Sequence, residues 1–338
     1  MGTGRDGGKQ VGAIMDYGSL IWVTLQRSKT AREAVKTIDH LLQTYGYSSS
    51  GESFSIGDTK EAWLMEIYPK GTELGAVWVA SRVPDGYVGS HANQARTRTF
   101  KMDDPDNVLF AKDVVTYAQR KGWYPKDKPA EEFDFAAAYD PLSFSGARFC
   151  EARVWNIFQK LAPDMEQYLD YAKGYNLSNP MPLFVKPSQK MSVNDTMWSM
   201  RTHFEGTWFD TTGLLRPDVG AGPGNSAYRA RPLEWKSGGK SYVNERTVSV
   251  QQTGWNFVSQ GRPNMPPPIS SLFWWAPDES GTALRVPLYG GATRVPIGFA
   301  DPVGQEPAGA VKGAPVADAG KMSLDSAFWV WNLVANIA

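Results

Sequence analysis

Chemically reactive side chains are scarce in this sequence. It has a single cysteine, Cys150, so no disulfide can form within the chain. Its three histidines, His40, His91 and His203, are widely separated, and a zinc site would need mostly carboxylates. No HExxH, paired CxxC, P-loop or GxSxG motif occurs. We therefore expect neither a metal nor a cofactor.

Long apolar runs and an excess of either charge are also absent. No run approaches the ~20 residues of a membrane span, and the opening MGTGRDGGKQ lacks the apolar core of a signal peptide. Lys plus Arg and Asp plus Glu both number 35, which argues against a nucleic-acid surface or a basic membrane face. We expect no membrane or nucleic-acid partner. The single cysteine fits a reducing compartment, with the cytoplasm favoured.

The length of 338 residues suits one large domain or two ordinary ones, and an apolar content of 42% is enough for a sizeable core. Residues 1–12 are polar and rich in glycine, and we expect a loose segment there. Their formal GxGxxG spacing follows no strand, so it fails as a dinucleotide motif. Residues 13–338 show no repeat and no clear linker, which favours a single domain.

Residues 51–98 are the most informative stretch. Three apolar runs, 54–56, 62–68 and 76–83, alternate with turns that contain glycine, aspartate or proline. Their Trp, Val, Ile, Phe and Tyr side chains suit a pleated, half-buried surface. The pattern predicts two successive antiparallel hairpins.

Polar side chains accompany these strands without an obvious purpose in a sheet core. Glu66 lies within an apolar run, Arg82 and Asp85 flank a Val-Pro pair, and Asn93 and Arg96 follow. Burial of a charge or an amide without a partner costs about 2 kcal/mol or more, so these groups should face one another, water or a ligand. An internal ion-pair network and a ligand site are both open interpretations.

Helical patterns flank the hairpins. The clearest covers 30–45, where Thr30 and Glu33 form a capping box before an apolar stripe. Further helices are predicted over residues 104–121, 146–161, 192–204 and from 323 to the end, with strands over 243–258, 270–275 and 285–288, and loops over 125–145 and 214–240.

Three blocks together resemble the PepD-type cysteine dipeptidases, which include dipeptidase A and its secernin relatives. The blocks read GESFSIGDTKEAWLMEI, WVASRVPDGYVGSHANQAR and NERTVSVQQTGWNFVSQ, and the similarity extends from about residue 17 to the end. The resemblance implies an α+β fold of the N-terminal-nucleophile hydrolase type, a four-layer αββα sandwich, incomplete at both ends in this sequence. It also implies a dipeptide substrate, hydrolysed by an N-terminal cysteine.

In that chemistry one residue has two tasks. Its side chain attacks the carbonyl, and its free α-amino group, with a pKa of about 8, acts as the base. This sequence begins with Met1 and has no cysteine before Cys150. Cys150 lies in an apolar helical stretch, RFCEARVW, without an evident electropositive setting, so we interpret it as a small buried hydrophobe. We therefore expect the 338-residue chain to be inactive.

Two explanations of the missing nucleophile stay open. The sequence is an internal fragment, which its uncapped final helix favours, or a chain that has lost its nucleophile and serves as a secernin-like interaction protein. An acylase that cleaves a non-peptide amide is a third alternative. Side-chain preference and oligomeric state, a homo-oligomer included, also stay open.

The resemblance implies roles for four residues. In related amidases an asparagine amide stabilises the oxyanion, which points to Asn93, and such a donor contributes about 3 kcal/mol in the transition state. An arginine orients the nucleophile, and Arg96 or Arg82 would hold the substrate carboxylate through two hydrogen bonds. Glu66 would meet the substrate ammonium. Asn93 and Arg96 are thus the candidate catalytic residues, and Arg82 and Glu66 the candidate substrate-binding residues.

Overall fold

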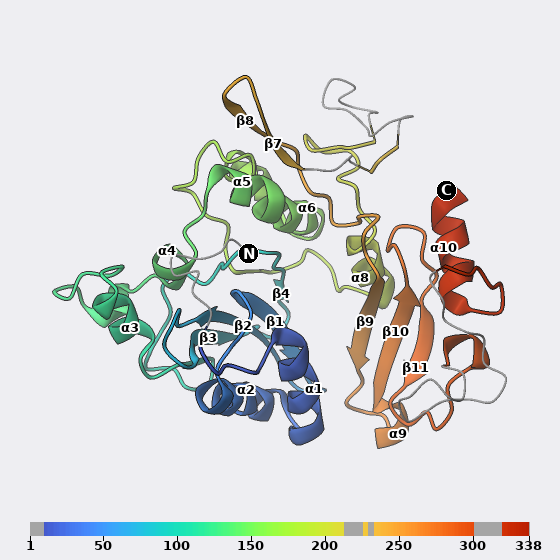
Figure 1. Ribbon diagram of the computed structural model, residues 1–338, viewed down its shortest axis with the longest axis horizontal. Coiled ribbons are helices and arrows are strands. Elements are labelled where there is room, and N and C mark those ends of the chain that lie inside the picture. Colours follow the sequence, from blue (N-terminus) through green and yellow to red (C-terminus); the bar gives the residue numbers. More distant parts are fainter. Residues whose placement is uncertain (1–9, 213–225, 229–232, 301–319, 338) are drawn as a thin grey trace. The chain divides into compact units, whose positions relative to one another are not determined.

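The computed structural model combines helices with antiparallel sheets in two compact units, which confirms the α+β class (Figure 1). Unit 1 is formed by Met1–Lys190 and Glu234–Glu245, and unit 2 by Met191–Leu233 and Arg246–Ala338. Within them the structure describes residues 10–212, 226–228, 233–300 and 320–337.

A four-stranded antiparallel sheet organises unit 1. Its order is β1 (Glu52–Gly57), β2 (Ala62–Pro69), β3 (Ala76–Arg82) and β5 (Val108–Phe110). In this register Glu66 of β2 lies opposite Ser53 of β1 and Val79 of β3. The two hairpins predicted within residues 51–98 are therefore confirmed.

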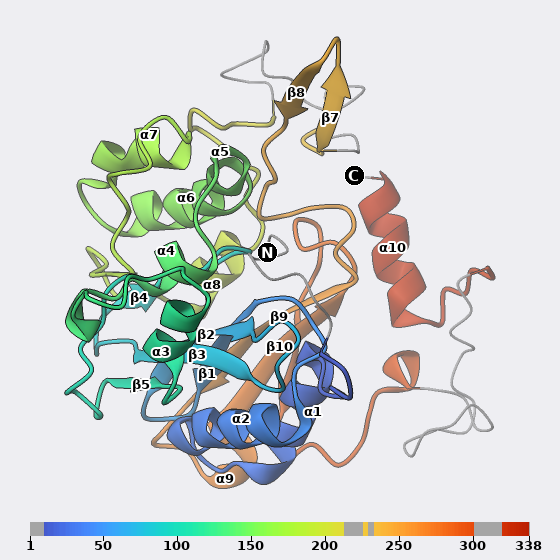
Figure 2. The ribbon, with the colours of Figure 1, turned by 60° about the vertical axis from the view of Figure 1, so that its left-hand side comes forward.

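Helix α2 (Ala31–Tyr45) lies against one face of this sheet, and α1 (Tyr17–Arg27) packs on α2 (Figures 1 and 2). Strand alternation places Trp63 and Trp78 on that face. The Trp78 indole donates to Asp39 of α2 at 2.7 Å, and Arg32 of α2 lies 4.8 Å from the Trp63 ring. The opposite face of the sheet carries Glu66.

Helix α2 begins as predicted, with one difference in its cap. Thr30 accepts a hydrogen bond from the Glu33 backbone at 3.1 Å. The Glu33 carboxylate accepts from the Lys29 backbone at 2.8 Å rather than from Thr30, so the reciprocal bond of a capping box falls one residue earlier.

The helix predicted over residues 104–121 is wrong in its first half. Val108–Phe110 forms β5, paired with Val79–Ser81 of β3, and only Val114–Arg120 is helical (α3). The side chains of this strand are large and apolar, and an open edge of β3 supplies the hydrogen bonds.

The prediction of a surface loop over 125–145 is also wrong. Phe135–Tyr139 forms α4, and its Phe135 and Tyr139 side chains are fully buried. The Tyr139 ring stacks on Tyr68 at 5.2 Å and lies 4.9 Å from Phe135. Burial of these large aromatic rings stabilises a packed helix here more than the proline and charged residues, which suggested a loop, disfavour it.

The helix predicted over 146–161 is confirmed, with an irregular start. A short helix α5 (Phe144–Gly146) leads into a π-helical turn, Ala147–Glu151, and then into α6 (Ala152–Leu161). The remaining elements of unit 1 are short: β4 (Val88–Gly89), η1 (Ala130–Glu132), η3 (Met165–Tyr168), α7 (Leu169–Ala172), β6 (Phe184–Val185), β7 (Glu234–Ser237) and β8 (Lys240–Val243).

The hairpin of β7 and β8 corrects the loop predicted over 214–240. Gly238 and Gly239 make its turn at φ values of 55° and 75°, a conformation that glycine adopts without strain. Residues 213–225 and 229–232 of that predicted loop lie outside the described part of the chain.

Unit 2 is built around a three-stranded antiparallel sheet in the order β11 (Val286–Tyr289), β10 (Ser271–Pro277) and β9 (Trp255–Gly261). The strands predicted at 270–275 and 285–288 are confirmed, whereas only the end of the strand predicted at 243–258 belongs to β9. The described part of unit 2 also contains the helices α8 (Val193–Ser199), α9 (Pro267–Ser270) and α10 (Ala327–Ile337) and the short 3-10 helix η5 (Ile297–Phe299).

Helix α8 carries the predicted capping box of Ser192 and Asp195 but ends at Ser199, not at residue 204. Phe204 has a φ of 70°, which a helix cannot contain. The Glu205 carboxylate accepts from Thr202 and from the His203 backbone, and these local bonds replace further helical turns. No helix within the described ranges is long and apolar enough to cross a membrane.

Candidate functional site

The polar segment that follows β3 is anchored to the sheet by Glu66. One carboxylate oxygen accepts from the Arg96 backbone at 2.7 Å, and the other accepts from the Thr97 backbone at 2.9 Å. The Glu66 side chain is 1% exposed, and burial raises its pKa although these two bonds oppose the shift. Glu66 thus fixes the path of residues 96–97.

Arg96 joins three segments of unit 1. Its Nε lies 3.2 Å from the Glu151 carboxylate, and its terminal nitrogens donate to the carbonyls of Ser90 at 3.0 Å, Pro182 at 3.0 Å and Leu183 at 3.3 Å. The guanidinium is almost fully buried. Its donors are therefore directed at protein groups.

Arg82 lies apart from this group. It pairs with Asp85 at 2.8 Å and with Glu61 at 3.5 Å. Its partner in the register is Trp63, so Arg82 lies on the sheet face opposite Glu66. The structure brings Glu66 and Arg96 together and leaves Arg82 outside.

Asn93 contacts the turn of helix that contains the only cysteine. Its Oδ1 accepts from Arg153 at 2.7 Å, and its backbone hydrogen-bonds the Cys150 thiol. The same Arg153 guanidinium lies 3.9 Å from the Cys150 sulfur. The amide of Asn93 is thereby oriented, because an oxygen facing Arg153 turns the NH₂ group away from it.

Cys150 itself is buried at 4% exposure. Burial raises the pKa of its thiol, although the charge of Arg153 opposes the shift. The thiol is therefore protonated at neutral pH, as expected of a small buried hydrophobe and not of a nucleophile.

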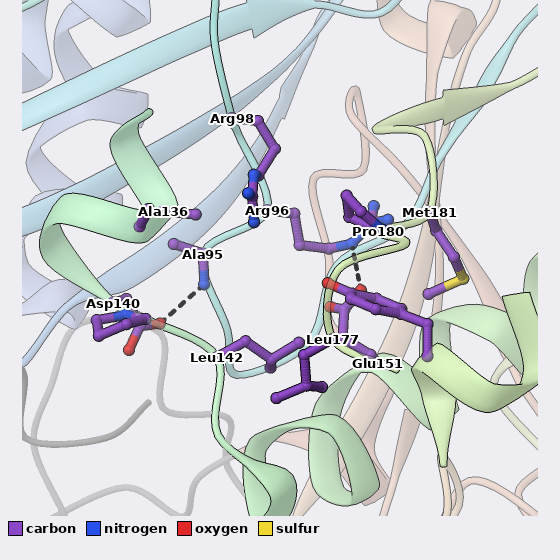
Figure 3. Close-up of a pocket in the computed structure, with 13 residues that line it drawn as sticks. Ala95, Arg96, Arg98, Ala136, Asp140, Leu142, Glu151, Leu177, Pro180 and Met181 are labelled. Carbon is purple, nitrogen blue, oxygen red and sulfur yellow. Dashed lines mark hydrogen bonds and ion pairs between the residues drawn. The ribbon is translucent and has the colours of Figure 1, made fainter. Parts of the chain in front are cut away.

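A cavity of about 120 Å³ lies beside this network (Figure 3). Its charged and hydroxyl-bearing walls come from Arg96, Arg98, Asp140, Glu151 and Tyr171, and its apolar walls include Ala95, Leu142, Leu177, Pro180 and Met181. It is slightly smaller than the roughly 150 Å³ cavity that holds benzene in another protein. A short side chain or a protonated amine is of suitable size.

The carboxylates at the cavity differ in their partners. Asp140 accepts from the Ala95 backbone at 2.9 Å, and burial raises its pKa. Glu151 is 1% exposed, and one of its oxygens receives Arg96. Its Oε1 has no hydrogen-bond partner among the residues that the structure describes. A donor brought into this cavity would therefore satisfy a buried acceptor.

His91 is hydrogen-bonded to Ser55, a residue that the sequence analysis did not single out. The Ser55 hydroxyl lies 2.8 Å from His91 Nε2. Burial, with the charges of Arg96 and Arg153, lowers the pKa of His91 to about 4. The imidazole is therefore neutral at physiological pH and a weak base. His203 lies in unit 2, 3.2 Å from Glu205.

Sequence reasoning missed Glu151, Arg153 and Tyr171. A signal for Glu151 was present, because it precedes Trp155 by four residues and Phe158 by seven, which places a carboxylate on the buried stripe of a helix. Within the described ranges, no group of three or more His, Cys, Asp or Glu side chains could hold a metal ion.

Comparison with known proteins gives one family. The sequence pattern of peptidase family C69 matches residues 9–338. A probable dipeptidase of Salmonella dublin is 26% identical over 272 residues, which is 80% of this chain and 53% of that protein. Dipeptidase A of Lactobacillus helveticus is 22% identical over 277 residues, 82% of this chain and 50% of that protein. The chain spans about half the length of the curated relatives it matches.

Proposed function

The chain belongs to peptidase family C69. We propose that it is part of a dipeptidase that acts by acyl transfer to a cysteine. The observation that carries this proposal is the family match over residues 9–338, since it includes the whole network around Glu66, Asn93, Arg96 and Glu151. In this reaction a cysteine sulfur bonds to the peptide carbonyl carbon, the C–N bond breaks as the leaving amine takes a proton, and water releases the acyl group.

The fold we propose is the αββα sandwich of N-terminal-nucleophile hydrolases. Two features support it. The sheet β1-β2-β3-β5 is antiparallel and has α2, with α1 packed on it, on one face, and the sheet β11-β10-β9 is antiparallel and contacts α10. Each would supply one sheet layer and one helix layer.

Asn93 is the proposed oxyanion donor. Its Oδ1 is held by Arg153 at 2.7 Å, so the two N–H groups of the amide have a fixed direction before substrate arrives. A donor that is already oriented contributes without reorganisation during the reaction. Arg96 is a positioning residue in this proposal, because it acts through Glu151 and through the backbone of its own segment.

The ammonium group of the dipeptide is proposed to enter the cavity and to meet Glu151 rather than Glu66. Both oxygens of Glu66 accept from backbone N–H groups, whereas Oε1 of Glu151 has no partner among the described residues. A protonated amine supplies three donors, and burial of a charge is tolerated when it is paired and hydrogen-bonded.

The proposal is tested with a substrate panel given to the protein as its organism makes it. We expect hydrolysis of dipeptides with free amino groups, and little hydrolysis of N-acetylated dipeptides, because acetylation removes the charge that Glu151 would bind. Glu151→Gln should raise KM for dipeptides at least about 10-fold, whereas the exposed Glu166→Gln control should leave it unchanged. Hydrolysis of acylated amines with no action on dipeptides would replace the dipeptidase by an acylase.

A second candidate is a non-catalytic interaction protein. Its supporting observation is Cys150, whose thiol is buried and protonated and is therefore not a nucleophile. A protein from its natural source that binds but never cleaves dipeptides or acylated amines would favour this candidate.

A further inference from the structure

The lining of the cavity beside Glu151 changes from exposed to buried residues (Figure 3). Ala137 is exposed, and the side chain of Arg98 is 46% exposed. Glu151, Tyr171 and Met181 also line the cavity, but they are at most 6% exposed. A ligand would therefore enter beside Ala137 and Arg98 and reach the Glu151 carboxylate at the closed end.

The charged side chains of this lining differ in the partners that they have. Arg98 pairs with Asp134 at 2.6 Å. Arg96 donates to Glu151 and to backbone carbonyls, and Asp140 accepts from a backbone N–H group at 2.9 Å. Only Oε1 of Glu151 is both buried and without a hydrogen-bond partner among the described residues of the lining. The cavity therefore needs a donor, which a protonated amine supplies.

The apolar walls of the cavity are held in place by contacts outside it. A Cβ atom placed on Gly146 would lie 3.2 Å from Leu142 Cδ1, so Leu142 packs closely against α5. Met181 directly precedes the two carbonyls that accept from Arg96 at 3.0 and 3.3 Å. Leu177 lies in a turn in which the preceding asparagine side chain accepts two hydrogen bonds, at 2.6 and 3.2 Å. The width of the cavity is thus set before a ligand binds.

The space between these walls is small. The cavity volume of about 120 Å³ is below the roughly 150 Å³ that holds one benzene molecule in another protein. An ammonium group at Glu151 occupies part of this volume. The remainder suits a hydrogen atom or a methyl group, whereas a leucine or phenylalanine side chain would force the walls apart, which is unfavourable in packed surroundings.

We propose that this cavity selects dipeptides whose N-terminal residue is glycine or alanine. The ammonium group meets Glu151 at the closed end, and Leu142, Leu177 and Met181 limit the size of the side chain beside it. This inference rests on the proposed function, which supplies the dipeptide as ligand and Glu151 as the partner of its ammonium group. The second residue of the dipeptide lies outside the cavity and is not selected by it.

Hydrolysis of a dipeptide panel by the protein as its organism makes it tests the selection. We expect glycyl-alanine and alanyl-alanine to have a kcat/KM at least about 10-fold above that of leucyl-alanine, because one methylene too many in a closed pocket already has an effect of that size. Alanyl-leucine, which has the same composition as leucyl-alanine, should be hydrolysed as well as alanyl-alanine. A leucyl-alanine value equal to that of alanyl-alanine would overturn the selection.

Two variants that widen the cavity test the residues that form its walls. Leu142→Ala and Leu177→Ala should each raise kcat/KM for leucyl-alanine at least about 10-fold relative to alanyl-alanine. Leu25→Ala, at a leucine of the same unit that is 74% exposed, should keep the ratio of the parent. The ratio compares two substrates on one preparation, so a smaller fraction of folded enzyme does not alter it. An unchanged ratio in both wall variants would overturn the proposal.

Binding to the 338-residue chain separates this inference from the proposed function. Ligand-observed NMR titration with alaninamide and leucinamide, which carry a free amino group, requires no hydrolysis. Tighter binding of alaninamide in a protein that never hydrolyses dipeptides would support the cavity and overturn the proposed function. Equal binding of both amides, or of neither, would overturn the size selection, while dipeptide hydrolysis by the natural protein would leave the dipeptidase proposal standing.

Discussion

Replacement of Arg96 by methionine separates a structural role of this arginine from a substrate-binding role. The guanidinium is 2% exposed and contacts the Glu151 carboxylate and three backbone carbonyls. Arg96→Met would leave the Glu151 carboxylate buried without a cation. Loss of one partner of a buried ion pair costs about 3–5 kcal/mol, and the orphaned carbonyls add to that loss.

The exposed pair of Arg120 and Glu73 supplies the scale for comparison. Their side chains are 51% and 45% exposed at a distance of 2.7 Å. Solvent screening limits such a pair to about 0–1 kcal/mol, so Arg120→Met should be nearly neutral. The double variant Arg96→Met with Glu151→Met should recover most of the loss, because it removes the unpaired carboxylate as well.

Urea unfolding of the four chains, followed by intrinsic tryptophan fluorescence, gives these differences directly. A loss of stability in Arg96→Met no larger than in Arg120→Met would refute the reasoning. It would mean that the Arg96 guanidinium is held loosely enough to serve a substrate carboxylate, as the sequence first suggested.

Three further predictions concern other parts of the chain. Burial raises the pKa of Glu205, but hydrogen bonds from His203 and Thr202 outweigh it and lower the pKa to about 2, from 4.5. Its stabilisation is thus present above pH 4.5 and lost as the pH falls towards 2, and Glu205→Gln should flatten the fall in urea midpoint over that range, which an unchanged profile would contradict. Thr30→Ala removes the cap of α2 and should lower the free energy of unfolding by about 1 kcal/mol in urea titration; no measurable loss would count against the cap. Cys150 should react with a thiol reagent far more slowly in the native protein than in urea, and equal rates would contradict its burial.

Sequence patterns predicted correctly those elements whose structure depends mainly on interactions between residues close together in the chain. The hairpins of residues 51–98 follow from alternation and turn residues, and α2 follows from its cap and stripe. The errors at 104–121 and 125–145 have a different cause. Whether Val108–Phe110 becomes a strand depends on the open edge of β3, and whether Phe135 and Tyr139 are buried depends on distant rings. Neither is visible in a local window.

The candidate site shows the same limit. The sequence marked Glu66, Asn93 and Arg96 as polar groups in need of partners, and the structure shows those partners. Glu151 and Arg153 come from a helix some 60 residues later in the chain. Only tertiary packing shows that Glu66 serves backbone groups while Glu151 lines the cavity.

The central claim is that residues 91–98 and the cavity form an acyl-transfer site. Its most direct test is kcat for dipeptide hydrolysis by the protein as its organism makes it and by its Asn93→Ala variant, with the exposed Asn194→Ala as control. Loss of an oxyanion donor should lower kcat about 100- to 1000-fold with little change in KM, while the control stays at the parent rate. Equal kcat in the parent and in Asn93→Ala would contradict the account.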